Sequence, residues 1–419
     1  MNVRRRDSCR LCGGTALDRV LSLPPTPPAN AFVPAPVAQD LHPQDVFRCT
    51  SCGHVQLGHV VDAETLFGEY VYASGTSPVF VKHFDDYAQA VVTRFGVKPG
   101  DRVVEIGSND GVLLRAFKAR GAAVLGVDPA RKIAAAASAS GVETRAEFFT
   151  EDLARALRAE GGPAKVITAN NCMAHIDDLA GVVRGVAALL ADDGVFVMEV
   201  QYLVELVRQG LWDMVYAEHV SYHHVGPLIP FFARAGLGVF DVQAVPTHGG
   251  SIRVFVRRAA PFLERADWDG REGAWTSREA FARLQARIGE QTRGLKQVLA
   301  DLKRRGGDGL VAGYGVPAKA TTLMYTMGLS RADIDYCVDD SPWKIGLLSP
   351  GLHVPVLAPT ALLERRPRAI VIFAWNFADS IAEKIRAMFA AAGGEAPPIV
   401  VPLPEPRIMA VPGPAGVPA

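Results

Sequence analysis

The sequence predicts an α/β fold of three parts, in which a small zinc-binding N-terminal module precedes two parallel sheets that are covered by helices. Two Cys-x-x-Cys pairs lie near the N-terminus, and apolar strands alternate with helical segments from about residue 80 to residue 260. The same alternation begins again near residue 309. Apolar strands between helices indicate parallel sheets that are buried on both faces. We therefore expect domains at 1–75, 76–265 and 266–419.

The composition is that of a globular protein and excludes several functional classes. The 419 residues suffice for two or three domains, and 44 Lys and Arg residues balance 44 Asp and Glu residues. A formal net charge of zero argues against nucleic acid or a membrane surface as a partner bound mainly through charge. No apolar run has the length of a membrane-spanning helix, and no apolar segment follows the basic N-terminus as in a signal peptide. We expect a cytoplasmic, monomeric protein without nucleic-acid or membrane partners.

Four of the six cysteines have the spacing of metal ligands. Cys9 and Cys12 form one pair, Cys49 and Cys52 form the other, and a glycine follows each pair. Two such turns can surround one zinc ion with four thiolates, which closes its coordination shell and makes the site structural. The alternative, a redox pair or free thiols, would require a separate explanation for each pair. We expect zinc to be necessary for folding but not for chemistry.

The central region is predicted to form the first parallel sheet. In open α/β sheets, ligands bind beyond the carboxyl ends of the strands, so the residues that follow each strand are candidates for a site. The strands are expected at 102–106, 123–127, 165–168 and 194–199, with helices at 113–120 and 179–190.

A glycine-containing turn follows the first of these strands. It reads Glu105-Ile-Gly107-Ser-Asn-Asp-Gly111, and the next strand ends at Asp128. Its G-x-x-x-G spacing differs from that of dinucleotide sites, and its acidic side chain suits a ligand with a cationic amino-acid end, such as S-adenosylmethionine (SAM). Asp128 could accept both ribose hydroxyls, although a structural turn with a surface aspartate is the alternative. The expected SAM contacts are Glu105, Gly107, Asn109, Gly111, Asp128 and Asn170.

A long helix is expected before the second sheet. Thr276 and Glu279 can form a capping box at its start, and one apolar stripe extends to Leu302 before a pair of glycines. We expect this helix at 275–306, followed by strands at about 309–315, 335–338 and 369–373.

A second glycine turn follows the first strand of the C-terminal region. Gly313-Tyr-Gly315-Val-Pro-Ala318 has the G-x-G-x-x-A form of a dinucleotide fingerprint, which alone is a weak indication of NAD. Helix amides together with Lys319 would suit a diphosphate equally well. Lys344 and Trp375 could line the same cleft, although each could equally be a surface or packing residue.

A run of polar residues follows the fourth strand of the first sheet. Tyr216-Ala-Glu218-His219-Val-Ser-Tyr222-His-His224 carries ionisable or hydroxylic side chains at most positions. A polar surface loop with locally satisfied histidines is the alternative. The density of such groups near the carboxyl edge of an open sheet favours a functional site.

These motifs together resemble the SAM-dependent sugar C-methyltransferases, which act on nucleotide-linked 4-keto-deoxysugars in antibiotic biosynthesis. The resemblance covers nearly the whole chain, in order: the double Cys-x-x-Cys, the Glu105 turn, the run 216–222, the segment 248–253 and the turn 313–319. It implies a zinc-binding N-terminal domain, a class I methyltransferase core with a Rossmann-like sheet, and a Rossmann-like C-terminal domain that helps to hold a dTDP-linked sugar.

The resemblance also implies the catalytic residues. It places the base at His219, with Glu218 and Tyr216 beside it. Histidine has a reference pKa of about 6.5, so it can take a proton from a carbon next to a ketone while the developing enolate is stabilised. Tyr216 would orient the substrate, and Glu218 would orient His219 or contact the sugar. The expected substrate contacts are Tyr72, Ser74, Ser77, Asn171, Tyr222, His224, His248, Arg253, Gly313, Gly315, Lys319, Lys344 and Trp375.

Three other functions stay open on the sequence. SAM could methylate an oxygen or nitrogen of a nucleotide sugar. The second glycine turn could serve a nicotinamide oxidoreductase. The chain could also bind a sugar nucleotide without catalysing a reaction.

Overall fold

The computed structural model describes residues 3–68, 75, 78–306 and 309–410. Tyr72, Ser74 and Ser77, three of the expected substrate contacts, lie outside the described residues.

The chain divides into two compact units, and the domain boundaries expected at 75/76 and 265/266 stay predictions. None of the helices in the described ranges is long and apolar enough to cross a membrane. The first unit contains Met1–Ser22, Asp45–Arg208 and Glu218–Phe281, and the second contains Leu23–Gln44, Gln209–Ala217 and Ala282–Ala419.

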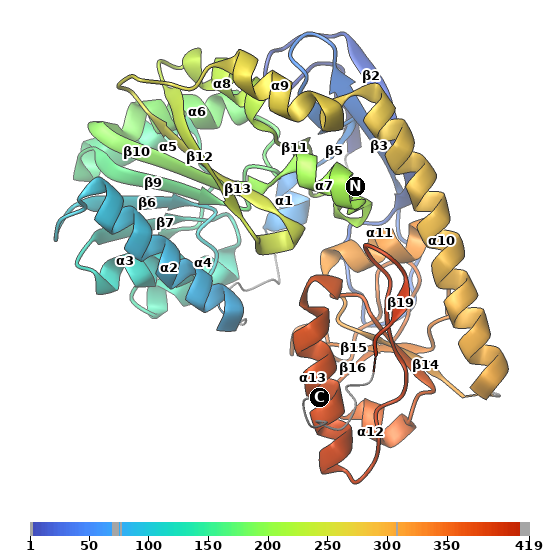
Figure 1. Cartoon of the computed structure of the whole chain (residues 1–419). Helices are drawn as coiled ribbons and strands as arrows, with labels where there is room; N and C mark the ends of the chain where they lie inside the picture. Colours follow the sequence, from blue (N-terminus) through green and yellow to red (C-terminus); the bar gives the residue numbers. More distant parts are fainter. Residues whose placement is uncertain (1–2, 69–74, 76–77, 307–308, 411–419) are drawn as a thin grey trace, which may run out of the picture. The chain divides into compact units, whose positions relative to one another are not determined.

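The first unit contains a seven-stranded sheet in the order β12-β13-β10-β9-β6-β7-β8 (Figure 1). From β10 to β8 the strands are parallel, whereas β13 is antiparallel to both β10 and β12. The expected parallel sheet is therefore confirmed. The strands are β6 Arg102–Ile106, β7 Ala123–Val127, β8 Thr144–Arg145, β9 Ala164–Asn170, β10 Leu190–Gln201, β12 Gly238–Val245 and β13 Ser251–Arg257.

The central strands are apolar because helices cover both faces of this sheet. Residues 166–169 of β9 and 195–200 of β10 are all buried. Both strands are longer than expected, since β10 pairs with β9 on one side and with β13 on the other. In Figure 1, α2 and α3 lie together on one face, and α5 and α6 lie together on the other. The helices are α2 Pro78–Phe95, α3 Val112–Ala119, α4 Arg131–Ala139, α5 Glu151–Gly161 and α6 Leu179–Leu189.

Short strands surround the N-terminal cysteines. One four-stranded sheet has the order β11-β4-β3-β2, and β1 pairs with β5. β11 belongs to the polar run, and its Ser221 pairs with Gln56 of β4, so strand pairing joins this run to the N-terminal residues. The elements are β1 Val3–Arg5, β2 Leu17–Thr26, β3 His42–Cys49, β4 Val55–Leu57, β5 His59–Val61, α1 Ala63–Phe67 and β11 Ser221–Tyr222.

Short helices follow β10 and β12. The helix expected at 275–306 agrees with α10 except at its start, where a separate helix, α9, ends. α9 ends at Thr276 and α10 begins at Arg278, because Ser277 has an extended backbone. The expected capping residue was therefore wrong: Ser277 Oγ accepts the amide of Ala280 at 3.2 Å, whereas the hydroxyl of Thr276 donates to the carbonyl of Glu272. These helices are α7 Leu203–Gln209, η2 Trp212–Met214, α8 Val225–Ala233, η3 Thr247–Gly249, α9 Arg265–Thr276 and α10 Arg278–Gly306.

The second unit contains a six-stranded sheet in the order β16-β15-β14-β17-β18-β19. All strands except β19 are parallel, and β14 is central, which confirms a second α/β sheet. The expected strands at 335–338 and 369–373 agree with β15 and β17 within one residue at each end. The elements are β14 Val311–Tyr314, α11 Ala318–Thr326, β15 Tyr336–Val338, β16 Val356–Leu357, α12 Ala361–Arg365, β17 Ala369–Ile372, η4 Trp375–Phe377, α13 Ala378–Ala391, β18 Ile399–Val401 and β19 Arg407–Ile408.

Candidate functional site

The four N-terminal cysteines converge on one point. Their sulfur atoms all lie within 4.8 Å of one another, with Cys9 and Cys52 3.5 Å apart and Cys12 and Cys49 also 3.5 Å apart. Such a set of soft thiolates at these distances fits one tetrahedral zinc ion and leaves no open coordination position. The expected structural zinc site is therefore confirmed.

The two cysteine turns have the same backbone geometry. Gly13 donates its amide to the carbonyl of Cys9 at 2.9 Å, and Gly53 donates to the carbonyl of Cys49 at the same distance. Both glycines have positive φ, of 74° and 89°, which other residues adopt only with strain. The glycine after each pair is therefore what allows the turn to close around the metal.

The turn after β6 has an unusual backbone that brings the ends of three strands together. Gly107, Asn109 and Gly111 all have positive φ, of 68°, 51° and 77°. A Cβ at Gly107 would lie 2.7 Å from the Cβ of Cys172, so only glycine fits between the turn and the residues after β9. The amide of Gly107 donates to the carbonyl of Val127 at 2.8 Å, which fastens the turn to the end of β7.

Two buried carboxylates face this turn. Asp128 accepts the amides of Asn109 and Ala130 at 2.8 and 2.9 Å, one on each oxygen, and retains lone pairs for further donors. Glu105 accepts the side-chain amide of Asn170 at 3.0 Å. Burial raises the pKa of Glu105 to about 8, and the charges of Asp128 and Asp110 add to this effect although the bond from Asn170 opposes it. The environment that the protein gives Glu105 therefore favours its uncharged form at neutral pH.

Unpartnered polar atoms mark the same turn as a binding site. In the described part of the chain, Glu105 Oε2, Ser108 Oγ, Asp110 Oδ1 and Asn170 Oδ1 are buried without a hydrogen-bond partner. Buried polar groups are otherwise nearly always satisfied, so these atoms point to a ligand or to water. An acidic group among them suits the cationic amino-acid end of SAM, which makes the residues fit this cofactor.

The imidazole of His219 lies beside the segment that follows β9. His219 is 8% exposed, and its ring centroid lies 5.0 Å from that of His175. Burial lowers the pKa of His175 to about 4, so this neighbour is uncharged at neutral pH. The segment 171–175 therefore makes two contacts: its Cys172 lies against the Gly107 turn, and its His175 lies against His219. His219 and Glu218 belong to the first unit, whereas Tyr216 belongs to the second.

A buried ion-pair cluster lies at the end of β10, and sequence reasoning missed two of its members. Glu199 is fully buried, lies 2.7 Å from His83 Nε2 and accepts two bonds from Arg253 at 2.7 and 3.0 Å. Burial raises the pKa of Glu199, but His83 and Arg253 outweigh this and hold it below its usual value. The expected substrate contact Arg253 is thus engaged inside the protein, 3.9 Å over the ring of Tyr87. An acidic residue at the carboxyl end of an apolar parallel strand, such as Glu199, is the sequence feature that could have indicated this cluster.

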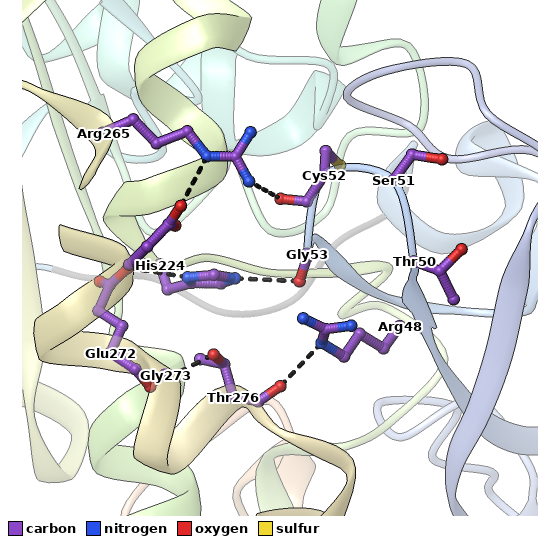
Figure 2. A pocket seen from close by; sticks show the side chains of 11 residues that line it. Arg48, Thr50, Ser51, Cys52, Gly53, His224, Arg265, Glu272, Gly273 and Thr276 are labelled. Carbon is purple, nitrogen blue, oxygen red and sulfur yellow. Dashed lines mark hydrogen bonds and ion pairs between the residues drawn. The ribbon is translucent and has the colours of Figure 1, made fainter.

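His224 lines a small polar pocket beside the cysteines (Figure 2). Its ring nitrogens lie 2.9 Å from Glu272 and 3.1 Å from the carbonyl of Gly53, so both are engaged. Arg265 donates to the carbonyl of Cys52 and Arg48 donates to that of Thr276, at 3.0 and 2.9 Å. The cavity of about 160 Å³ is therefore bordered by bonds that join the cysteine turns to α9. His224 acts here as a structural link, and its expected substrate contact stays a prediction.

The second glycine turn is closely packed. A Cβ at Gly313 would lie 2.5 Å from Cys337 Sγ, and one at Gly315, where φ is 75°, would lie 2.8 Å from the Cβ of Ala374. Asp339 accepts the amide of Val316 at 2.7 Å, which ties the turn to the end of β15. Lys344 donates to the carbonyl of the same Val316 at 2.9 Å.

Lys319, at the start of α11, belongs to a buried cluster of the second unit. Its ammonium donates to Asn376 at 2.7 Å and lies 3.6 Å from the ring centroid of Trp375. The indole of Trp375 donates to Asp213, a fully buried residue that sequence reasoning missed. Burial lowers the pKa of Lys319 to about 8, although the charge of Asp213 opposes this. Asp213 is the single acidic residue within the apolar run 211–215, and this pattern could have indicated a buried charge.

The remaining expected residues are placed as follows. Asn171 has φ of 55° and donates its amide to the carbonyl of Glu199 at 2.8 Å. Tyr222 is buried in β11, and its hydroxyl has no hydrogen-bond partner among the described residues. His248 has φ of 54° and its ring lies 5.2 Å from that of Phe80.

Three family profiles match consecutive parts of this chain. A zinc binding domain matches residues 9–67, a methyltransferase domain matches residues 80–242, and a C-methyltransferase C-terminal domain matches residues 246–404. The first profile includes all four cysteines, and the second includes the Glu105 turn and His219.

Similar proteins match either the whole chain or its central region. C-methyltransferase NovU of Streptomyces niveus is 36% identical and covers 97% of this chain and 98% of its own length. A ubiquinone biosynthesis O-methyltransferase of Burkholderia pseudomallei is 28% identical and covers 36% of this chain and 70% of its own. The crystal structure of magnesium protoporphyrin IX methyltransferase from Synechocystis, with bound SAH, is 15% identical with a TM-score of 0.34, over 43% of this chain and 83% of that one.

Removing one zinc ligand should unfold the N-terminal residues. In Cys49→Ser, three thiolates no longer close the coordination shell, so metal analysis should find about one zinc per chain in the wild type and little in the variant. Cys337→Ala is the matched control, because this cysteine is buried in β15 and lies in the second unit. Wild-type zinc content in Cys49→Ser would contradict the four-thiolate site.

SAM binding should release a proton from Glu105. The carboxyl group has a pKa of about 8 without ligand, so it is protonated at pH 6.5, and a cationic ligand favours its charged form. Calorimetry at pH 6.5 in buffers of different ionisation enthalpy should detect nearly one proton released. Glu105→Gln should release none and bind SAM at least about tenfold more weakly. Equal proton release by both proteins would show that Glu105 does not face the cation.

Proposed function

Because this chain belongs to the family of SAM-dependent C-methyltransferases, we propose that it methylates a carbon next to the ketone of a dTDP-linked 4-keto-deoxysugar. In this proposal His219 is the base that removes the proton from that carbon. The main support for this proposal is the segment after β9, which lies against both groups. Its His175 contacts His219, and its Cys172 lies against the proposed SAM turn. A buried imidazole near the donor turn is what such a reaction requires.

Transfer of a methyl group to carbon needs a carbanion-like nucleophile. A C–H bond next to a ketone loses its proton to a base, and the charge moves to the ketone oxygen as an enolate. His219 has the chemistry for this step, since imidazole titrates near neutral pH. Its neighbour His175 is uncharged, because burial lowers its pKa to about 4, so His219 can accept a proton without an adjacent positive charge. Tyr216 and Glu218 are proposed to orient the sugar and the imidazole.

The residues of the first glycine turn are proposed to hold the donor. When bound, SAM supplies an electrophilic methyl group on a sulfonium. Glu105, with Asn170 against it, would face the amino-acid end, and Asp128 would accept the ribose hydroxyls. The contacts of Gly107 with Val127 and Cys172 hold this turn in one position, so a donor bound there would be held in a defined orientation. The four cysteines have no open coordination position, so zinc has no proposed part in the chemistry.

The second unit is proposed to hold the thymidine diphosphate. Lys319 stands at the N-terminus of α11, where helix amides and a cation together attract a diphosphate. Its ammonium lies over the ring of Trp375 and donates to Asn376, and both contacts hold that cation at one position. The support for this role is the charge of Lys319 beside a glycine turn. NAD is the second candidate for this turn, because its G-x-G-x-x-A form is also that of a dinucleotide site.

His219→Asn should bind SAM normally and lose both methyl transfer and proton exchange. Loss of a general base costs about 10²–10⁴-fold in rate, so turnover of the dTDP-sugar should fall by that factor. Deuterium uptake from solvent at the carbon next to the ketone should fall in parallel, as followed by NMR. His353→Asn is the matched control, because His353 lies in the second unit with φ of 55°, a conformation that asparagine tolerates.

Three results would contradict this proposal. Normal turnover by His219→Asn would remove the histidine mechanism. A product whose new methyl group is bonded to oxygen or nitrogen would replace carbon methylation. Absorbance changes with NAD(P)H would assign the second turn to nicotinamide.

Binding of thymidine diphosphate should weaken as pH rises from 7 to 9. Lys319 has a pKa of about 8, so it is a cation below that pH and neutral above it. Thymidine diphosphate is already largely ionised at pH 7 and gains only a little negative charge by pH 9, so any weakening comes from Lys319. Lys319→Met should bind at least about tenfold more weakly at pH 7 and lose this pH dependence. Lys303→Met is the control, because its ammonium also belongs to the second unit and pairs with Asp333. An unchanged dissociation constant in Lys319→Met would exclude Lys319 from the diphosphate site.

A further inference from the structure

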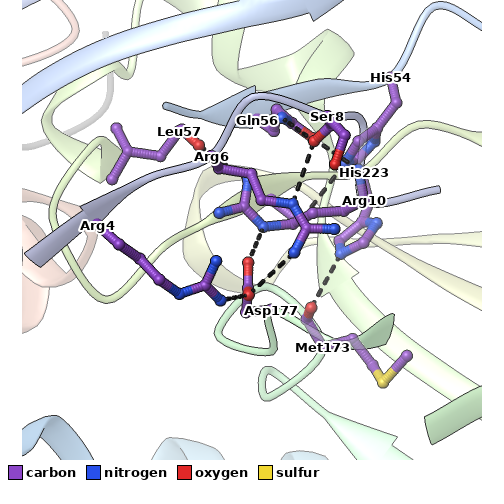
Figure 3. A network of polar contacts seen from close by, with 11 residues as sticks. Arg4, Arg6, Ser8, Arg10, His54, Gln56, Leu57, Met173, Asp177 and His223 are labelled. Atoms are coloured by element: carbon purple, nitrogen blue, oxygen red, sulfur yellow. Dashed lines mark hydrogen bonds and ion pairs between the residues drawn. The ribbon is translucent and has the colours of Figure 1, made fainter. Parts of the chain in front are cut away.

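Three arginine side chains from the N-terminal residues converge on one carboxylate, that of Asp177 (Figure 3). Arg10 Nε donates to one oxygen at 2.9 Å, and Arg6 donates to the other at 3.1 Å. Arg4 donates to the same oxygen as Arg6. Most single surface ion pairs contribute little to stability, so a network of this kind indicates a more specific role.

Arg10 is the buried member of this network. It lies within the first Cys-x-x-Cys, between Cys9 and Cys12, and its side chain is 0% exposed. Its guanidinium also donates to the carbonyl of Leu57 at 2.8 Å, and its amide donates to the side chain of Gln56. A buried guanidinium needs a partner charge, and Asp177 provides it. The metal-binding turn and Asp177 are therefore fixed to one another.

Asp177 lies in the segment that carries the site. This segment, residues 171–178, connects β9 to α6, and its last residue, Asp178, caps α6 by accepting the amide of Gly181 at 2.9 Å. His175 lies two residues before Asp177 and contacts His219. Two further bonds join the segment to the polar run. The backbone amide of Ser221 donates to the carbonyl of Ala174 at 3.1 Å, and His223 Nε2 lies 3.2 Å from the carbonyl oxygen of Met173.

We propose that Asp177 is a positioning residue, which holds the 171–178 segment and with it His219 in place through its ion pair with Arg10. This inference rests on the proposed function of His219. It gives the metal-binding turn a part in the geometry of the active site, beyond its own folding. Zinc would fix the turn when it is bound to the four cysteines. Arg10 extends from this turn to Asp177, and the segment between Asp177 and Cys172 sets the distance between His219 and the Glu105 turn.

The test compares Asp177→Asn with a matched control. Asparagine keeps the shape and still accepts a bond, but it removes the charge that balances Arg10. At saturating substrates, kcat should fall at least about tenfold while the KM for SAM changes little, because small displacements of a catalytic group have such effects and Glu105 and Asp128 are untouched. The control is Asp193→Asn, which breaks an exposed pair with Lys165 at the other end of β9 and β10.

A second measurement does not depend on turnover. Hydrogen exchange followed by mass spectrometry should show faster exchange over residues 171–178 and 219–223 in Asp177→Asn, with unchanged exchange in α2. Asp193→Asn should match the wild type in both regions. Zinc content and a thermal melt establish that each variant is folded. A folded Asp177→Asn with wild-type kcat and wild-type exchange would overturn the positioning role.

Asp177→Glu provides the same test if the asparagine variant does not fold. Glutamate keeps the negative charge for Arg10, but its longer side chain displaces the segment, so kcat should fall without loss of zinc. Wild-type kcat and exchange in Asp177→Glu would also overturn the proposal. Absence of turnover in the wild type would instead overturn the proposed function, and the exchange measurement would then decide the positioning role alone.

Discussion

The short segment between β9 and α6, residues 171–178, connects the main features of the first unit. Cys172 fills the space beside Gly107, where a side chain could not fit, and donates to the carbonyl of Ile106 at 3.1 Å. His175 packs against His219, and Asp177 pairs with Arg10 of the metal-binding turn. Parallel strands bring their carboxyl ends to one edge of a sheet, so residues after β9 necessarily lie between those that follow β6 and β10. This segment therefore contacts both His219 and the Glu105 turn.

The charges near this edge are arranged for a cationic ligand. Burial raises the pKa of both Glu105 and Asp128, and that of Glu105 reaches about 8. Glu199, which is as deeply buried, behaves oppositely because His83 and Arg253 supply positive charge. One carboxylate is thus already paired within the protein, whereas Glu105 retains an oxygen without a partner. This difference is why we propose Glu105, rather than Glu199, as the group that faces SAM.

Local patterns were predicted well, and long-range pairs were not. The zinc ligands and the Glu105 turn depend on spacing within a few residues, and family membership, which the motifs indicated, is confirmed by a relative that spans the whole chain. Ser277 replaced Thr276 as a helix cap because α9, which was not expected, extends to Thr276. The roles of Asp177 and Asp213 were not predicted, because their partners lie more than 100 residues away along the chain. No periodic pattern in the sequence indicates either pair.

In the proposed reaction, His219 takes the proton from a carbon next to the ketone while SAM is bound at the Glu105 turn. A crystal structure with S-adenosylhomocysteine and a dTDP-4-keto-sugar bound together tests this claim most directly. We expect a ring nitrogen of His219 about 3–3.5 Å from that carbon. We also expect the sulfur of the cofactor to face the same carbon along the direction of methyl transfer. A structure in which another group, such as His83, holds that position and His219 faces away from the sugar would contradict it.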